Sequence, residues 1–160
     1  MLKKLILFLG LIIFVSCDSN SVFTEYKNIS GNWNKNEKIE FLFQTPDSIN
    51  NYNIFLNLRN DERYKYSNLF LIVNIDISDN ETVSDTLEYR MTEMNGEWLG
   101  KGFSSLKENK LWYKENYIFP TNGDCTITVE HAMRKNGDVE GINELEGITD
   151  VGITIEKISK

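Results

Sequence analysis

The chain has 160 residues and a formal net charge of −7. Such an acidic chain repels the phosphates of nucleic acids and anionic headgroups, so we expect no nucleic-acid partner. Two cysteines are too few for a disulfide scaffold, and stability must therefore come from a buried core, for which 9 Phe, 7 Tyr and 3 Trp supply the apolar area.

Residues 1–16 have the order of a secretory signal peptide. Two lysines precede an apolar run from Leu5 to Val15, which is too short to span a bilayer. The small Ser16 then stands before Cys17, and this arrangement resembles the lipobox of bacterial lipoproteins, in which the cysteine is acylated and becomes the first mature residue. We expect Cys17 to carry the lipid that holds the protein on a membrane. The alternative is an ordinary signal peptide followed by a chance cysteine.

The rest of the chain divides into a short lead and one domain. Residues 17–34 are rich in Ser and Asn with scattered apolar positions, and we interpret them as lipid anchor and tether. Residues 35–160 are enough for a single domain with a real core.

Period-two alternation of apolar and polar side chains recurs along this domain and is typical of half-buried strands. It predicts strands at residues 39–43, 52–59, 68–77, 86–91, 110–119, 125–133 and 151–158. The segment 68–77 is apolar on both sides, which predicts a central strand covered on both faces over its first half. Asn136-Gly137 is a hairpin-turn signal, and residues 140–149 are predicted to be loop.

About seven or eight short strands with no convincing helix indicate an all-β domain. We predict an antiparallel β-sandwich, with jelly-roll or immunoglobulin-like connectivity left open.

Catalytic residues are scarce. The single histidine, His131, is interpreted as a half-buried strand-end residue with a backbone partner rather than as a catalytic base. Cys125 lies six residues earlier on the same strand, about 20 Å away, which excludes a hydrogen-bonded nucleophile pair and makes Cys125 a small core residue. The sequence contains no hydrolase, zinc, P-loop or dinucleotide motif, so we expect no catalytic site and no cofactor.

A calcium site is one alternative that we consider. Four carboxylates surround one turn and offer the hard oxygen ligands that calcium prefers, although their spacing matches no EF-hand loop. They are Asp76, Asp79, Glu81 and Asp85. Acidic turns are common in so acidic a chain, and we predict no metal site.

A sugar-stacking platform is another alternative. Trp98, Trp112 and Tyr117 have the side chains that stack on sugar rings, whereas core packing is the usual fate of such aromatics.

The segment from Arg59 to Asn68 combines Arg and Tyr, the residue types favoured at protein–protein hot spots, in what we predict to be a loop. We hypothesise that a partner docks there. The residues concerned are Arg59, Arg63, Tyr64, Lys65 and Tyr66. The alternative is a solvated connection between two strands.

Five motifs in order resemble the GldH gliding-motility lipoproteins of the Bacteroidota, over a stretch from about Asn51 to the C-terminus and with the lipobox cysteine in addition. They are LRNDERYKYSNLFLIV (58–73), DTLEY (85–89), GEWLGKG (96–102), HAMR (131–134) and GITDVGITIEK (147–157).

This resemblance implies a cell-envelope lipoprotein that supports surface gliding together with the type IX secretion machinery. It implies contacts with other gliding or secretion envelope proteins, and it brings no active-site residue; only Cys17 is carried over, as the acylated residue. A glycan-binding module and a glycan-processing enzyme are the alternatives from other functional classes.

Two further expectations come from resemblance to exported proteins of these bacteria. Surface-exported lipoproteins carry an acidic run after the cysteine, and here only Asp18 is acidic, so we expect an outer-membrane lipoprotein that faces the periplasm. Asp47-Ser48-Ile49 and Asp85-Thr86-Leu87 resemble a short O-glycosylation acceptor pattern. We favour Ser48, in a predicted loop, over Thr86, in a predicted strand.

Overall fold

The computed structural model describes residues 20–78 and 82–159. The predicted signal peptide and Cys17 lie outside the described residues, as do two of the four calcium candidates, Asp79 and Glu81. In the described part of the chain, no helix is long and apolar enough to cross a membrane.

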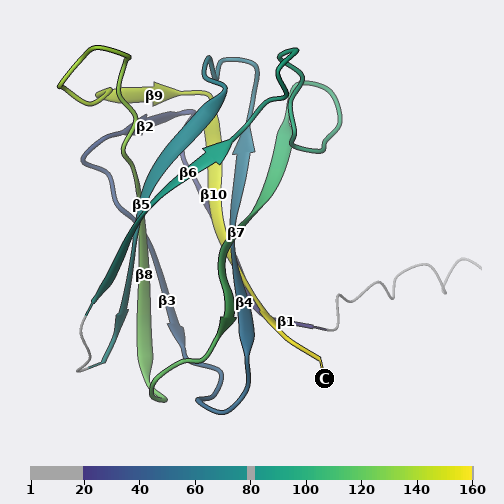
Figure 1. Ribbon diagram of the computed structural model, residues 1–160, viewed down its shortest axis with the longest axis vertical. Helices are drawn as coiled ribbons and strands as arrows, with labels where there is room; N and C mark the ends of the chain where they lie inside the picture. Colours follow the sequence, from purple (N-terminus) through teal and green to yellow (C-terminus); the bar gives the residue numbers. More distant parts are fainter. Residues whose placement is uncertain (1–19, 79–81, 160) are drawn as a thin grey trace, which may run out of the picture.

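Two four-stranded antiparallel sheets pack face to face (Figure 1). The first sheet has the order β1 (Ser21–Asn28), β10 (Ile148–Lys157), β4 (Tyr52–Asn60) and β7 (Lys107–Tyr117). The second has the order β3 (Ile39–Gln44), β8 (Asp124–His131), β5 (Asn68–Ile77) and β6 (Val83–Arg90). A small ribbon of β2 (Asn32–Asn34) and β9 (Glu144–Glu146) lies at one end.

The connectivity is that of a jelly roll. Without the short ribbon, eight strands remain, four in each sheet. The neighbouring pairs are those of a jelly roll: β1 with β10 and β4 with β7 in the first sheet, and β3 with β8 and β5 with β6 in the second. The predicted antiparallel sandwich is confirmed, and of the two connectivities left open the structure has the jelly roll.

The core lies between the two sheets and follows the alternation seen in the sequence. On β5, Leu69, Leu71 and Val73 are fully buried between the sheets, and on β4 the same is true of Ile54 and Leu56. Because side chains alternate across a strand, these residues share one face of each strand and pack against the other sheet.

Three features differ from the sequence-based predictions. Most of residues 21–34, predicted as tether, lie in β1 and β2 and are part of the sandwich. β1 is an edge strand bonded to β10, and Phe23 holds it to the core by stacking on Phe43, with ring centroids 4.7 Å apart.

In the predicted 140–149 loop, three residues form β9 and the last two begin β10. β5 is central as predicted, but Phe70 and Ile72 on its outer face are only half-buried, because no further layer covers them in the described structure.

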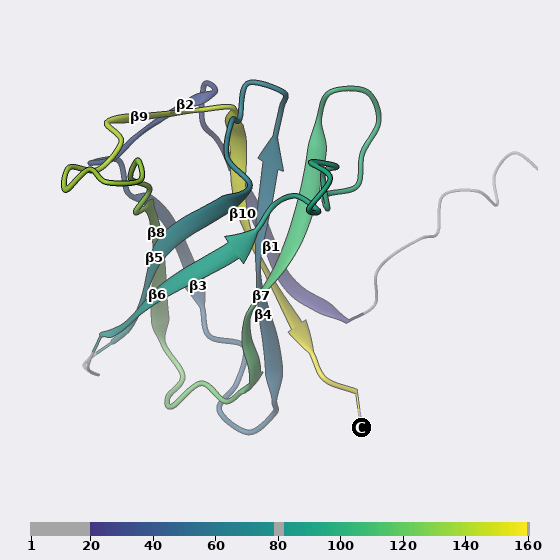
Figure 2. The ribbon, with the colours of Figure 1, turned by 45° about the horizontal axis from the view of Figure 1, so that its top comes forward.

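The two ends of the sandwich carry different loops. Ser21 pairs with Glu156, and Asn28 pairs with Asp150, so β1 runs from the end at which the described chain begins and ends to the opposite end. We call these the exit end and the distal end. The loops 45–51 and 118–123 lie at the exit end, and the loops 61–67 and 134–143 lie at the distal end (Figure 2).

Candidate interaction groove

The turn after β4 is braced by its own side chains. The Asp61 N–H donates to the Gly147 carbonyl at 2.9 Å, which joins the turn to the start of β10. The Asp61 carboxylate accepts the Arg63 N–H at 2.9 Å and forms an ion pair with the Arg63 guanidinium at 2.7 Å. These bonds from Arg63 lower the pKa of Asp61 below its usual value, because they favour the ionised carboxylate.

Two glycines allow neighbouring chain segments to approach this turn. The Arg63 guanidinium lies against Gly31, and the backbone of Tyr64 lies against Gly147, so closely that a Cβ at either glycine would overlap it. Both glycines have positive φ, +78° and +88°, a conformation that glycine adopts without steric cost. The turn is therefore held at the distal end by two segments distant in sequence.

Tyr64 was predicted as a docking residue, and the structure contradicts this. Its side chain is only 2% exposed and belongs to the core cluster. Its hydroxyl donates to the Asn68 carbonyl at 2.7 Å, and its ring packs edge-on against Tyr66 and beside Trp98. A partner cannot reach the Tyr64 side chain. Tyr64 instead supports the turn from the core side.

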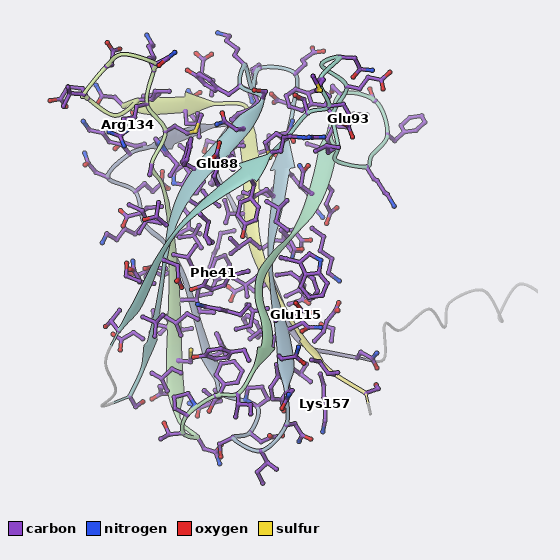
Figure 3. The ribbon with its side chains drawn as sticks, viewed as in Figure 1. Phe41, Glu88, Glu93, Glu115, Arg134 and Lys157 are labelled. Atoms are coloured by element: carbon purple, nitrogen blue, oxygen red, sulfur yellow. The ribbon has the colours of Figure 1, made fainter. Side chains whose placement is uncertain are left out.

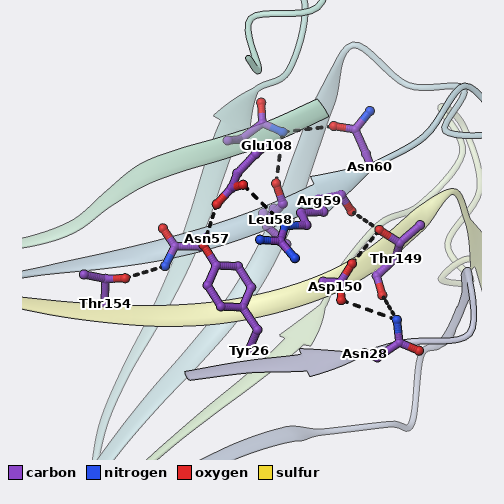
Figure 4. Close-up of polar contacts among 11 residues, drawn as sticks. Tyr26, Asn28, Asn57, Leu58, Arg59, Asn60, Glu108, Thr149, Asp150 and Thr154 are labelled. Carbon is purple, nitrogen blue, oxygen red and sulfur yellow. Dashed lines mark hydrogen bonds and ion pairs between the residues drawn. The ribbon is translucent and has the colours of Figure 1, made fainter. Parts of the chain in front are cut away.

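Arg59 also has a role other than the predicted one. It lies in β4, not in the loop, and points to the outer face of the first sheet (Figure 4). Its guanidinium stands 4.4 Å from the Tyr26 ring centroid and pairs with Glu108 at 3.4 Å. Tyr26 donates to the same carboxylate at 2.5 Å, and burial together with Glu108 raises the pKa of Tyr26 to about 12. This network links the edge strands β1 and β7 across the sheet.

The other three predicted docking residues are brought together. Arg63, Lys65 and Tyr66 line one wall of a groove of about 540 Å³, which we call the charged groove. The opposite wall comes from the segment between β8 and the end of β9. It contributes Lys135, Asp138, Glu140, Gly141, Ile142, Asn143, Glu144 and Glu146.

Charges of both signs face each other in the charged groove. Lys65 pairs with Glu146 at 3.1 Å, and Asn34 donates to Glu144 at 2.5 Å. Lys35 approaches Glu140 at 3.9 Å. These carboxylates are engaged with cations or amides, an arrangement suited to polar recognition rather than to acid–base chemistry.

A second groove of about 780 Å³ begins at the other side of Tyr66 and has a more apolar floor. Phe70 and Met133 line it, together with Thr86 from β6 and Arg134 from the segment after β8. Tyr66 therefore stands between two hollows of different character (Figure 3 shows Arg134 and Glu88 at this end).

The sequence-based prediction did not identify the wall formed by residues 134–146. It did include the turn at Asn136-Gly137, where Gly137 has φ +88° and the Asp138 N–H donates to the Lys135 carbonyl at 3.0 Å. The missed signal was the alternation Glu144-Leu145-Glu146, in which Leu145 is buried and both glutamates point to solvent.

The residues considered for chemistry are structural. His131 is buried, its Nε2 lies 3.0 Å from the Trp33 carbonyl, and its Nδ1 has no hydrogen-bonding partner among the described residues. His131 lies at the end of β8 and has a backbone partner, as predicted. Its side chain is buried, whereas the prediction was half-buried. Cys125 is fully buried, as predicted, and burial raises the pKa of its thiol to about 12.

Asp85, one of the calcium candidates, bonds to neighbours in β7. It pairs with Lys114 at 2.8 Å and accepts the Tyr113 hydroxyl at 2.9 Å, so it joins the edges of the two sheets. In the described residues, no group of three or more His, Cys, Asp or Glu side chains converges as a metal site would require.

The three aromatics considered as a sugar platform do not share a surface. Trp98 packs beside Tyr64 at the distal end, and Tyr117 packs edge-on against Phe119 in the core. Trp112 is 55% exposed and lies against Phe55 on the outer face of the first sheet. They offer no common stacking face to a sugar chain.

The two glycosylation candidates lie in different settings. Ser48 is half-buried in the loop at the exit end. One oxygen of the neighbouring Asp47 carboxylate accepts backbone N–H bonds from Ile49 and Asn50 within that loop, and the other accepts the hydroxyl of Tyr52, the first residue of β4, at 2.7 Å. Thr86 is exposed on β6, which is an edge strand, and it points into the second groove.

Comparison with protein families gives one match over most of the chain. A family model described as GldH lipoprotein matches residues 21–155, a range that begins with β1. A gliding motility lipoprotein GldH homolog of Christiangramia forsetii is 52% identical over 147 residues, covering 92% of this chain and 90% of that protein. The gliding motility lipoprotein GldH of Flavobacterium johnsoniae is 43% identical over 152 residues, covering 95% of this chain and 94% of that protein.

Two solved structures show a weaker similarity to the chain. The VP2 subviral particle of infectious bursal disease virus is 17% identical, with a TM-score of 0.37 and coverage of 86% of this chain and 33% of that chain. The Eiger TNF structure from S. frugiperda is 7% identical, with a TM-score of 0.32 and coverage of 88% of this chain and 94% of that chain.

Proposed function

Because the chain belongs to the GldH family of gliding-motility lipoproteins, and is therefore anchored to a membrane, we propose that it works by protein contact through the charged groove. In this proposal it is an outer-membrane lipoprotein that faces the periplasm, carries its lipid on Cys17 and supports gliding together with the type IX secretion machinery. Its partners are other envelope proteins of that machinery, and no catalysis is involved.

The observation that supports protein contact best is the convergence of Lys65 and Tyr66 with the segment 135–146. Lys65 has a strongly exposed side chain that pairs with Glu146, and Tyr66 has an amphipathic ring that lines both grooves. Fixed charges of both signs select a partner of complementary charge and suppress wrong partners, which is how polar interfaces gain specificity.

The test replaces the exposed Lys65 and the half-buried Tyr66 and leaves Asp61, Arg63 and Tyr64 of the turn unchanged. Lys65→Ser with Tyr66→Ser should reduce colony spreading of a gliding host that lacks its own copy, and should reduce secretion through the associated machinery. The matched control is Lys101→Ser with Phe103→Ser, which removes an exposed cation and an exposed aromatic ring from the segment between β6 and β7. Both double variants are first checked for membrane association and thermal midpoint.

Contact at the groove is read directly by a photo-crosslinking amino acid at position 65 in living cells. A single envelope protein crosslinked from position 65, and not from position 101, would support the proposal. Normal spreading of the folded Lys65/Tyr66 variant would refute it, as would an equal defect in the control.

O-glycosylation at Ser48 and Thr86 remains a proposal for the native host. We now favour Thr86 over the half-buried Ser48, because Thr86 is exposed on the edge strand β6. A glycan on its side chain would not interrupt the hydrogen bonds between strands. Intact-mass measurement of the native protein, of Thr86→Ala and of Ser48→Ala tests this. A native mass equal to polypeptide plus lipid would show that neither residue is modified.

A further inference from the structure

Very little chain separates the proposed anchor from the folded domain. Only residues 18–20 lie between Cys17 and Ser21, the first residue of β1. A fully extended segment of four steps spans at most about 14 Å. The domain therefore cannot stand far from the bilayer that holds the lipid, and its exit end must lie beside the headgroups.

Hydrogen bonds fix which surfaces surround the point of exit. The Asn20 carbonyl accepts the Lys157 N–H at 2.8 Å, and the Asn51 carbonyl accepts the Ile158 N–H at 3.0 Å. These bonds join the start of the described chain, the C-terminal segment and the end of the 45–51 loop in one row at the exit end.

The loop after β7 lies beside this row. Tyr52 and Tyr117 face each other in the β4–β7 ladder, so Ile118 follows directly alongside Asn51. The Thr45 N–H donates to the Gly123 carbonyl at 2.9 Å, which holds the 45–51 and 118–123 loops together.

Aliphatic side chains are exposed on this row. Ile49 is 85% exposed, Ile118 is 50% exposed, and Val22, at the bulge of β1 next to the exit point, is 46% exposed. Isolated apolar residues are common on protein surfaces, but these three all lie at the exit end, where the described chain begins.

The carboxylate nearest to Ile49 in the sequence, that of Asp47, is held by hydrogen bonds within the protein. Asp47 turns its carboxylate into its own loop, where the backbone N–H of Asn50 donates at 2.7 Å and Tyr52 donates at 2.7 Å. These bonds, with that of the Asn50 backbone first, hold the pKa of Asp47 well below its usual value. Lys157 lies at the same end and offers a cation to phosphate groups (Figure 3).

We propose that the exit end is a membrane-seating surface, in which Ile49, Ile118 and Val22 enter the headgroup region of the bilayer that carries the lipid on Cys17. The proposal rests on the anchoring of Cys17 in the proposed function and adds an orientation to it. Amphipathic surfaces of this kind bury their apolar side chains about 5–10 Å into the interface. The charged groove then points away from the membrane.

Exposed apolar side chains also exist at the distal end, and the short tether decides between the two ends. Phe103 is 96% exposed there. The eight residues of β1 span about 27 Å between the ends, roughly twice the reach of the tether. An upright domain therefore brings only the exit end to the headgroups.

The test measures depth with a fluorophore in the full-length acylated protein, reconstituted in phosphatidylethanolamine–phosphatidylglycerol vesicles. Ile49→Cys and Val139→Cys each receive a nitrobenzoxadiazole label, because both native side chains are aliphatic, lie in loops and are similarly exposed, 85% and 89%. The buried Cys125 should not react, and unsubstituted protein controls for this. Headgroup-nitroxide lipid should quench the label at position 49 at least about threefold more than the label at position 139.

Every outcome bears on the proposal. Equal quenching at the two positions would overturn it, because the domain would then have no preferred end. In an Ile49→Cys background, Val22→Glu with Ile118→Glu should reduce quenching while the protein still floats with the vesicles; unchanged quenching would show that the tether alone sets the position. Failure to float would remove the Cys17 anchor itself, and both proposals with it.

Discussion

At the scale of single residues, the single histidine, His131, makes stability depend on pH. Burial lowers the pKa of His131, so the folded protein resists protonation while the unfolded chain accepts a proton near the ordinary value of about 6.5. Stability is therefore greatest above that value and declines as the pH falls from 6.5 towards the lowered pKa.

We expect the urea midpoint to decrease between pH 7.5 and pH 5.0, and to decrease less in His131→Gln. The amide can keep a donor near the Trp33 carbonyl and cannot be protonated in this range. This window lies above the pKa range of ordinary carboxylates, so the carboxylates contribute little to the change. Identical slopes for the two proteins would assign the pH dependence to other groups.

Alanine substitutions at two glycines with the same backbone conformation distinguish the cost of backbone strain from the cost of steric overlap. Gly147 and Gly137 both have φ +88°, but a Cβ at Gly147 would overlap the Tyr64 backbone, whereas nothing lies within 4 Å of one at Gly137. Gly137→Ala should cost about 1 kcal/mol, from strain in the left-handed region alone. Gly147→Ala should cost at least about 3 kcal/mol, because the turn must also move. Similar unfolding free energies for the two variants would contradict the close packing of this turn.

At the scale of elements, the well-predicted strands share one property. β3, β4, β5 and β8 have one face in the core, so their sequences alternate and their bounds could be predicted to within a residue or two. β1 could not be predicted in this way, because an edge strand needs few buried side chains, and Phe23 is the β1 residue that packs against the core cluster.

One wall of the charged groove could be predicted from the sequence, and the other could not. Residues 63–66 carry side chains whose types indicate recognition, and three of the predicted docking residues do meet in the charged groove. The burial of Tyr64 depends on the approach of Gly147, which is 83 positions away, and no local pattern carries that information. The partner wall at residues 135–146 likewise becomes visible only when β9 pairs with β2.

The weak hold on β1 gives a prediction for this element. Phe23→Ala removes the stacking on Phe43 and should cost about 1–2 kcal/mol, less than the about 3–5 kcal/mol of a fully buried phenylalanine, because Phe23 is only partly buried. Amide hydrogen exchange should rise throughout 21–28 and remain slow in β5. Val22→Ala, which removes an exposed neighbour, is the matched control. Uniform faster exchange over the whole domain would show that β1 does not open separately.

At the scale of the whole molecule, the anchor determines where the domain can act. Cys17→Ala should yield protein that no longer incorporates radiolabelled palmitate and that leaves the membrane fraction. The unfolding midpoint of the domain should stay unchanged, because every strand of the described sandwich lies after Cys17 in the sequence. Protease added to intact cells should spare the wild-type lipoprotein if it faces the periplasm. Retained labelling of the variant would contradict acylation at Cys17, and rapid digestion of the wild type would place it on the cell surface.

The distance between anchor and groove is the last property that can be tested. With three residues of tether and β1 upright, the charged groove stands at a nearly fixed height above the membrane. A flexible Gly/Ser insertion of about 20 residues after Asp18 would let the domain wander by a root-mean-square distance of about 25 Å. We expect this variant to remain in the membrane fraction with an unchanged thermal midpoint but to spread poorly, since the groove no longer meets its partner at a defined height and orientation. The same 20 residues added after Lys160 serve as the matched control and should leave spreading intact. Full spreading with the long tether would show that the groove binds a mobile partner for which height above the membrane is irrelevant.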